Sequence, residues 1–226
     1  MALPCAGLPR WLNKDICKMA VSMTELVEAA SVIPVLTVGE VSQAAPLAKA
    51  LKAGGLRVVE MTWRTEAALE VMQAMKSAEP DLIVGMGTIR TPDQARASMD
   101  AGADFLVSPG LTPSLSSFLP SCGVPVLPGV ATAGEAMSAV EAGFEVLKFF
   151  PAEQAGGRSY LKSLYGPLPD IRFCPTGSIS AEMATDYLAL PNVVCVGGSW
   201  IATKAMVEEG DWATIEANAR LAAAMG

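Results

Sequence analysis

The sequence has 226 residues, of which 51% are hydrophobic and 17% are charged, and its formal net charge is −7. This composition excludes a disordered chain and is typical of one large domain with many buried elements. The acidic balance argues against a nucleic-acid partner, because nucleic-acid-binding proteins carry a basic footprint.

The N-terminal 20 residues are predicted to form an arm or a lead-in helix, followed by one domain over residues 21–226 without an internal linker. The chain start lacks the ordered zones of a signal peptide, and no apolar run reaches the roughly 18 residues of a membrane span. The cysteines are odd in number and form no CxxC pair: Cys5, Cys17, Cys122, Cys174 and Cys195. We therefore expect free thiols, a cytoplasmic location and no membrane partner.

Short apolar runs rich in β-branched residues recur every 20 to 26 residues or so, and each is closed by Gly, Pro or a small polar residue. Their continuous hydrophobicity is typical of parallel strands covered on both faces. The predicted strands are Val32–Val38, Arg57–Trp63, Leu82–Thr88, Asp104–Pro109, Pro125–Val130, Glu145–Pro151, Ile171–Thr176 and Val193–Gly198.

Segments with helical spacing lie between these strands. Ser42 is the expected N-cap of the first, and a threonine–proline pair opens two others, at Thr91 and Thr112. Glycine ends three of the helices, where a left-handed residue is favoured. The predicted helical segments include Val41–Ala53, Thr65–Ala78, Thr132–Ala142, Ser180–Leu188 and Asp211–Met225.

Eight strands alternating with helices predict an α/β fold, a (β/α)₈ TIM barrel with an N-terminal extra helix. An open doubly wound sheet is the alternative, but no GxGxxG motif follows the first strand. Active sites of such barrels lie at the C-terminal ends of the strands, and polar residues of this sequence concentrate at those ends.

Lys148 stands in the apolar run Val146–Pro151, near the end of the sixth predicted strand. Burying an ammonium ion is costly, so an amine there tends to lose its proton and becomes a nucleophile that attacks ketones. The alternative is a lysine on an edge strand whose head reaches water. Its position at a strand end favours the functional interpretation.

Glu60 lies inside another apolar strand, and the chain contains no histidine. Acid–base work must therefore fall to a carboxylate, Lys, Tyr or Cys, and Glu60 is the candidate. A structural ion pair with Arg57 or Arg64 is the alternative. The sequence offers no Asp/Glu cluster with metal-ligand spacing, so we expect neither a metal nor a cofactor.

Arg64 ends the same strand as Glu60, and its guanidinium can bind a planar carboxylate with two hydrogen bonds. Thr88 could add a hydroxyl to the same anion. A surface arginine at a helix start is the alternative, although the helix dipole would disfavour it. If Lys148 attacks a 2-keto acid, Arg64 is the residue to hold its carboxylate.

Two loops of small residues follow the last two strands, Thr176-Gly177-Ser178 and Gly197-Gly198-Ser199. Many barrels bind phosphate groups at backbone N–H groups in these two places. The alternative is a pair of tight turns, for which glycine is the usual residue. The pair predicts a substrate that carries a phosphate.

With these motifs in this order, nearly the whole chain resembles the 2-keto-3-deoxy-6-phosphogluconate (KDPG) aldolase family, also described as 2-keto-4-hydroxyglutarate aldolases. The most specific matching segments are Glu60–Thr65, Gly85–Thr88, Val107–Gly110, Pro128–Val130, Lys148–Glu153, Arg172–Gly177 and Gly197–Trp200. The resemblance implies a metal-free class I lyase without a cofactor, on a TIM barrel, usually as a homotrimer. It implies reversible cleavage of KDPG to pyruvate and D-glyceraldehyde 3-phosphate, a step of the Entner–Doudoroff pathway.

The resemblance also implies roles for individual residues. Lys148 matches the lysine that forms the Schiff base, Glu60 the acid–base carboxylate, and Arg64 and Thr88 the positions that hold the pyruvyl carboxylate. The residues that match the pocket walls and the phosphate region are Pro109, Phe150, Thr176, Gly177, Ser178, Gly198 and Ser199.

This chain departs from the family pattern at Ser178, where a second glycine is usual, and at Trp63, where leucine is common. A side chain at Ser178 would narrow the phosphate loop or add a hydroxyl to it. Sister activities on the galactonate-derived epimer or on 4-hydroxy-2-oxoglutarate remain open from the sequence, as does a non-catalytic phosphate-binding barrel or an isomerase of the phosphate-binding barrel type.

Overall fold

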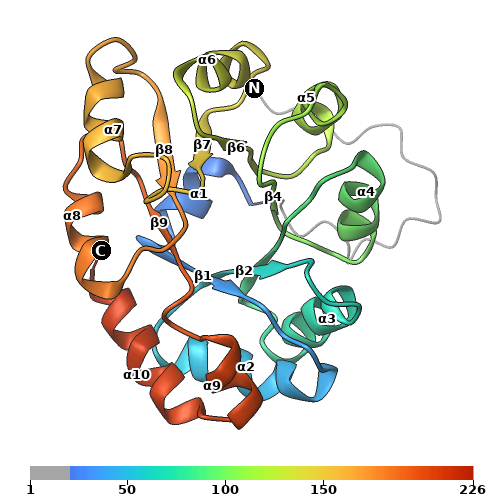
Figure 1. Cartoon of the computed structure of the whole chain (residues 1–226). Helices are drawn as coiled ribbons and strands as arrows, with labels where there is room; N and C mark the ends of the chain where they lie inside the picture. Colours follow the sequence, from blue (N-terminus) through green and yellow to red (C-terminus); the bar gives the residue numbers. More distant parts are fainter. Residues whose placement is uncertain (1–20, 226) are drawn as a thin grey trace.

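The computed structural model describes residues 21–225, and in this part of the chain nine parallel strands form a ring that is surrounded by helices (Figure 1). The strands are β1 Val32–Leu36, β2 Val58–Thr62, β3 Ile83–Gly87, β4 Leu106–Val107, β5 Val126–Leu127, β6 Gly129–Val130, β7 Val146–Phe149, β8 Arg172–Pro175 and β9 Val196–Gly198.

The ring is made of two sheets, ordered β5-β4-β3-β2-β1-β9 and β6-β7-β8. Strands β5 and β6 are the two halves of one predicted strand, and they part at Pro128, which has no N–H to donate to a sheet. Parallel bridges between Phe173 and Val193 and between Thr176 and Gly197 connect β8 to β9. The predicted (β/α)₈ barrel is confirmed, and the open doubly wound sheet is excluded.

The helices of residues 21–225 follow the strands around the outside of the ring, except α1, which precedes β1. They are α1 Met23–Glu28, α2 Ala44–Ala53, α3 Ala68–Ala78, α4 Pro92–Asp100, α5 Pro113–Phe118, α6 Ala133–Glu141, α7 Gly157–Tyr165, α8 Ala181–Leu188, α9 Lys204–Glu209 and α10 Trp212–Ala223, with 3₁₀ turns η2 Val41–Gln43 and η3 Leu119–Ser121. None of them is long and apolar enough to cross a membrane.

The caps of these helices show why the sequence starts and stops them where it does. Thr91 and Thr112 cap α4 and α5, each with proline at the start of the helix, as predicted. Gly102 and Gly143 follow α4 and α6 with φ of 90° and 96°. The predicted cap at Ser42 is wrong: it lies within η2, whose cap is Glu40, and α2 continues from that turn.

Two apolar clusters hold the fold together. One lies between the strands and the outer helices. The other fills the interior of the ring near the N-terminal ends of the strands, with inward residues such as Val58, Phe105 and Val146. Leu26 of α1 packs on this inner cluster, so α1 closes the end of the barrel where the strands begin. The predicted lead-in helix over residues 1–20 lies outside the described residues.

Gly54 gives a test of the contact between α2 and α10. A Cβ atom there would overlap the Cβ of Ala219 and lie 2.7 Å from the carbonyl oxygen of Glu216. We expect Gly54→Ala to lower the free energy of unfolding by about 1–3 kcal/mol, because an overpacked contact must open. Urea unfolding measures this loss.

Gly134 in α6 is the matched control, because a Cβ there would meet nothing within 4 Å. Gly134→Ala should leave the stability unchanged or raise it by up to about 1 kcal/mol, since it restricts the unfolded chain. Equal losses for both variants would contradict the packing argument.

Candidate active site

The alternation of side chains along β2 and β7 carries Glu60 and Lys148 into the interior of the barrel. Val58 and Val146 belong to the inner apolar cluster, whereas Val59 belongs to the outer one. Side chains two positions apart in a strand share a face, so Glu60 lies above Val58 and Lys148 above Val146.

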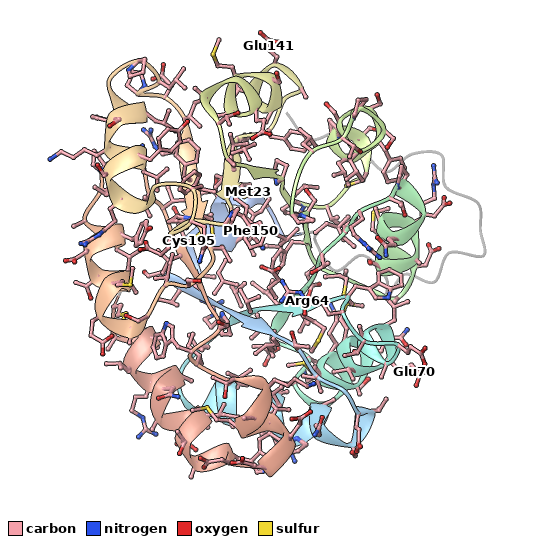
Figure 2. The ribbon with its side chains drawn as sticks, in the orientation of Figure 1. Met23, Arg64, Glu70, Glu141, Phe150 and Cys195 are labelled. Carbon is pink, nitrogen blue, oxygen red and sulfur yellow. The ribbon has the colours of Figure 1, made fainter. Side chains whose placement is uncertain are left out.

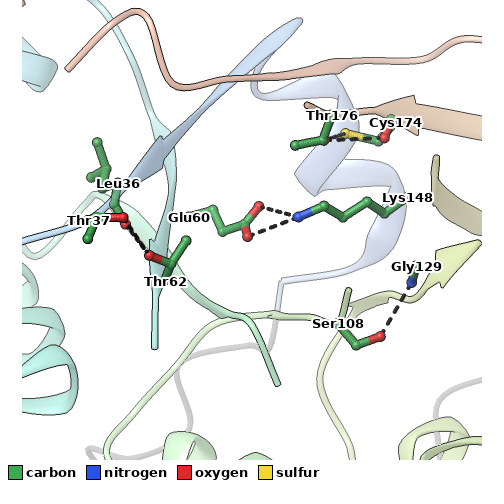
Figure 3. A network of polar contacts seen from close by, with 9 residues as sticks. All are labelled: Leu36, Thr37, Glu60, Thr62, Ser108, Gly129, Lys148, Cys174 and Thr176. Atoms are coloured by element: carbon green, nitrogen blue, oxygen red, sulfur yellow. Dashed lines mark hydrogen bonds and ion pairs between the residues drawn. The ribbon is translucent and has the colours of Figure 1, made fainter. Parts of the chain in front are cut away.

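These two side chains form a buried ion pair. Lys148 Nζ lies 3.2 Å from Glu60 Oε1 and 3.5 Å from Oε2, and the residues are only 5% and 4% exposed (Figure 3). The ammonium group also lies 5.3 Å from the ring centroid of Phe150. The alternative pairing of Glu60 with Arg57 or Arg64 is wrong.

The contact with Glu60 adds a charge that the sequence did not place beside Lys148. Lys148 is buried as predicted, but a carboxylate faces its amine. A buried ion pair is rarely the most stable filling of such a space, because removing both charges from water costs several kcal/mol per ion. The pair is better explained by chemistry, since it holds a proton acceptor beside an amine.

Glycines make room around the pair. A Cβ at Gly87 would overlap the carboxylate of Glu60, and one at Gly85 would lie 2.5 Å from the ring of Phe105. On the other side, a Cβ at Gly129 would overlap Pro109, and one at Gly197 would overlap the side chain of Thr176. The signal for Gly129 and Gly197 was in the sequence: each is a glycine within a predicted strand, where a side chain would normally fill the barrel.

A cavity of about 240 Å³ opens at the C-terminal ends of β7 to β9 and β1. It is lined by six predicted site residues, Arg64, Phe150, Thr176, Gly177, Ser178 and Ser199, and also by Val35, Ile179 and Gly197. Figure 2 shows Arg64 and Phe150 toward the middle of the ring. A second hollow of about 400 Å³ lies at the opposite end, around Met23, Pro125 and Phe144, and contains none of the predicted residues.

Five predicted residues do not line this cavity: the buried pair Lys148 and Glu60, and the three residues Gly198, Pro109 and Thr88. A Cβ atom at Gly198 would lie 2.8 Å from Nε1 of Trp200, so a side chain at this position would not fit without a shift. The carbonyl group of Pro109 lies against Gly129. Thr88 follows β3 with φ of 64°, and within residues 21–225 the only other non-glycine residue with positive φ is Ser178, at 58°. Such strain in a β-branched residue persists where the surroundings demand it, and it concentrates at functional sites.

A threonine pair at the ends of β1 and β2 was not predicted. Thr62 Oγ1 donates to the carbonyl oxygen of Leu36 at 2.7 Å, and it lies 3.0 Å from Thr37 Oγ1 (Figure 3). Since Thr62 has one hydroxyl proton, Thr37 must donate to Thr62. These bonds tie the two strand ends together beside Glu60.

Cys174 in β8 and Cys195, which directly precedes β9, are buried free thiols. A hydrogen bond with Cys174 and burial raise the pKa of the Cys195 thiol well above its usual range. Cys122 is also free, while Cys5 and Cys17 lie outside the described residues. In residues 21–225, no group of three or more His, Cys, Asp or Glu side chains could hold a metal ion.

Comparison with known proteins identifies relatives of the chain. A family model described as KDPG and KHG aldolase matches residues 23–218. A 2-dehydro-3-deoxy-phosphogluconate aldolase of Pseudomonas aeruginosa is 46% identical over 84% of this chain and 87% of that protein. A KHG/KDPG aldolase of Escherichia coli is 42% identical over 88% of this chain and 93% of that protein.

Solved structures similar to this chain belong to the same kind of enzyme as these relatives. KDPG aldolase from Legionella pneumophila, with pyruvate captured as a covalent carbinolamine, matches with a TM-score of 0.85 at 40% identity, over 88% of this chain and 96% of that one. The Zymomonas mobilis enzyme with 3-phosphoglycerate also has a TM-score of 0.85 at 40% identity, over 92% of this chain and 97% of that one.

The buried pair predicts a non-additive effect on stability. Lys148→Met leaves the Glu60 carboxylate without a partner, and we expect a loss of about 3–5 kcal/mol in the free energy of unfolding. The double variant Lys148→Met/Glu60→Leu removes both charges and should recover most of that loss. Denaturant unfolding of the single and double variants measures the coupling.

The exposed pair Lys204–Glu208 is the control, with its atoms 3.5 Å apart. Lys204→Met should cost less than about 1 kcal/mol, because water screens this pair. Losses at Lys148 and Glu60 that simply add would show that the two charges do not depend on each other.

Proposed function

This chain belongs to the KDPG and KHG aldolase family, and from that premise we propose that it cleaves 2-dehydro-3-deoxy-6-phosphogluconate reversibly to pyruvate and D-glyceraldehyde 3-phosphate. The enzyme is a lyase that works through a Schiff base. The observation that supports this reaction best is the buried pair of Lys148 and Glu60 at the base of the barrel mouth.

Lys148 is the proposed nucleophile, and its contact with Glu60 explains how the amine could lose its proton. An amine must lose a proton before it attacks, and Glu60 Oε1 lies 3.2 Å from Nζ, within reach of a direct transfer. The amine then adds to the C2 ketone of the substrate and forms a carbinolamine. Glu60 returns its proton to the departing hydroxyl, and loss of water leaves an iminium ion, which can accept the electron pair of the bond that breaks.

Glu60 is the proposed acid–base group for the remaining steps. Its carboxylate, directly or through a water molecule, takes the proton of the C4 hydroxyl. The C3–C4 bond breaks, the aldehyde leaves, and the electron pair enters the iminium to give an enamine. Return of a proton to C3 and hydrolysis of the imine then release pyruvate and free Lys148.

Arg64 is the proposed carboxylate clamp, with help from Thr88. Within residues 21–225, no carboxylate lies within 4 Å of the Arg64 guanidinium, and Arg64 lines the cavity. A substrate carboxylate can therefore accept both of its forked donors. Held in this way, the C2 carbon meets Lys148 in an attack-ready position.

The distal half of the substrate is proposed to lie along the other cavity wall. Pro109, Phe150 and Thr176 shape the space around the reacting carbons. Backbone N–H groups and hydroxyls of the last two strand loops take the phosphate. These loop residues are Gly177, Ser178, Gly198 and Ser199. Turnover of KDPG compared with its galactonate-derived epimer and with 4-hydroxy-2-oxoglutarate decides the preferred substrate.

Residues 21–226 are proposed to act as one domain, in a homotrimer that buries some of the exposed apolar side chains. Those side chains are Val41, Met137, Val140, Tyr165 and Leu221. A cytoplasmic location suits the unpaired neighbours Cys174 and Cys195, because a reducing compartment keeps thiols free.

Trapping of the imine tests the nucleophile. We expect pyruvate and borohydride to leave a reduced adduct on Lys148, found by peptide mass spectrometry, because the imine is reduced to a stable amine. The variant Lys148→Met should give no adduct. Labelling of another lysine in the wild-type protein, with Lys148 unmodified, would refute the mechanism.

Proton exchange at the methyl group of pyruvate tests Glu60. We expect Glu60→Gln to slow this exchange by about 10²-fold or more, because the amide cannot carry the proton. The exchange is followed by NMR in deuterated water. An unchanged rate would assign the acid–base role to another group.

A further inference from the structure

Ser178 is the loop residue that the sequence led us to expect as a departure from the family pattern, and the structure gives its hydroxyl a partner. Gln154 Nε2 donates a hydrogen bond to Ser178 Oγ at 2.9 Å. Gln154 lies in the turn after β7, the strand that carries Lys148, whereas Ser178 follows β8 and lines the cavity. The bond therefore joins two strand loops at the barrel mouth.

This bond is the last of three successive connections between the two loops. The N–H of Ala152 donates to the carbonyl oxygen of Thr176 at 2.9 Å, and the N–H of Glu153 donates to that of Gly177 at 3.4 Å. The side chain of Gln154 then reaches Ser178. Three consecutive residues of one loop thus bind three consecutive residues of the other.

The loop that presents Gln154 is firmly held. Within it, the N–H of Ala155 donates to the carbonyl oxygen of Pro151 at 2.9 Å, and that of Gly157 donates to Ala152 at 2.9 Å. The hydroxyl of the buried Tyr187 in α8 donates to the carboxylate of Glu153. Burial and this bond raise the pKa of Tyr187 above its ordinary value, so the hydroxyl remains a donor.

The direction of the bond decides what Ser178 can offer a ligand. A serine hydroxyl has one proton to donate and two lone pairs to accept with. Because the Gln154 amide occupies one lone pair, the proton is free to point elsewhere. Ser178 also holds a left-handed backbone, with φ of 58°, which costs energy for any residue but glycine.

We propose that Gln154 is a positioning residue, which fixes the Ser178 hydroxyl so that it donates to the phosphate group of the substrate. This inference rests on the proposed function, since that function supplies the phosphate. Gln154 need not touch the substrate. It would set the affinity for phosphorylated ligands and leave the chemistry at Lys148 unchanged.

Binding of 3-phosphoglycerate, compared with unphosphorylated glycerate, tests this inference without turnover. Gln154→Met keeps the side-chain length but removes the donor. We expect the dissociation constant for 3-phosphoglycerate, measured by titration calorimetry, to rise by about 3- to 10-fold, as for one lost neutral hydrogen bond. The affinity for glycerate should not change. A wild-type protein that fails to bind 3-phosphoglycerate would overturn the inference.

Gln154→Glu tests the direction of the bond. A carboxylate at this place would accept the Ser178 proton, so only lone pairs would face the phosphate. We expect a loss of about 10-fold or more for 3-phosphoglycerate. The same change in a Ser178→Ala background measures the effect of the added charge alone and should be smaller. Equal effects in both backgrounds would show that the hydroxyl plays no part.

Kinetics separate a positioning role from a structural one. Gln154→Met should raise KM for KDPG about 3- to 10-fold, leave its kcat unchanged, and leave cleavage of 4-hydroxy-2-oxoglutarate unaffected. In a Ser178→Gly background it should have no further effect. Equal losses on both substrates would mean that Gln154 only supports the loop. The pyruvate adduct on Lys148 reports the proposed function separately, so the two can fail independently.

Discussion

The buried contact between Lys148 and Glu60 is the constraint around which the upper half of the barrel is arranged. Two opposite charges at 3.2 Å can remain in a closed interior only if each keeps the other as its partner. Gly87 supplies the space for the carboxylate, because any side chain there would overlap it. The pair therefore suits the proposed chemistry better than it suits stability. The apolar residues nearer the N-terminal ends of the strands have to supply the stabilisation that the pair does not.

The barrel separates stability and chemistry along its axis, with the apolar layer at the N-terminal ends of the strands and the charged pair nearer their C-terminal ends. Inward residues of the lower layer, such as Phe105 and Val146, are apolar and close the interior together with α1. Above them the inward positions carry the charged pair and several glycines, and the cavity opens there. This separation would allow a residue such as Ser178 to alter ligand contacts at the mouth while the packing around Lys148 and Glu60 stays intact.

The three-residue connection between the loops of β7 and β8 adds a second link. It joins the loop that follows Lys148 to the loop proposed to hold the phosphate, so the two ends of a substrate would be bound by parts that cannot move independently. Tyr187 anchors this connection from α8 through Glu153. If these two loops hold the two ends of the substrate as proposed, a fixed spacing between them would favour substrates of one length over shorter or longer keto acids.

The sequence alone determined the barrel and the residue types of the site, because both are written in local patterns. Apolar runs at a regular interval predicted the strands, and a lysine within one of them indicated the proposed nucleophile. The division of the strand at Pro128 was less apparent, since a single proline interrupts an otherwise apolar run. Only the tertiary structure decided which partners meet: Glu60 with Lys148 rather than with an arginine, and Gln154 with Ser178 across 24 residues. Such pairings depend on the register and curvature of the closed ring, which no local pattern contains.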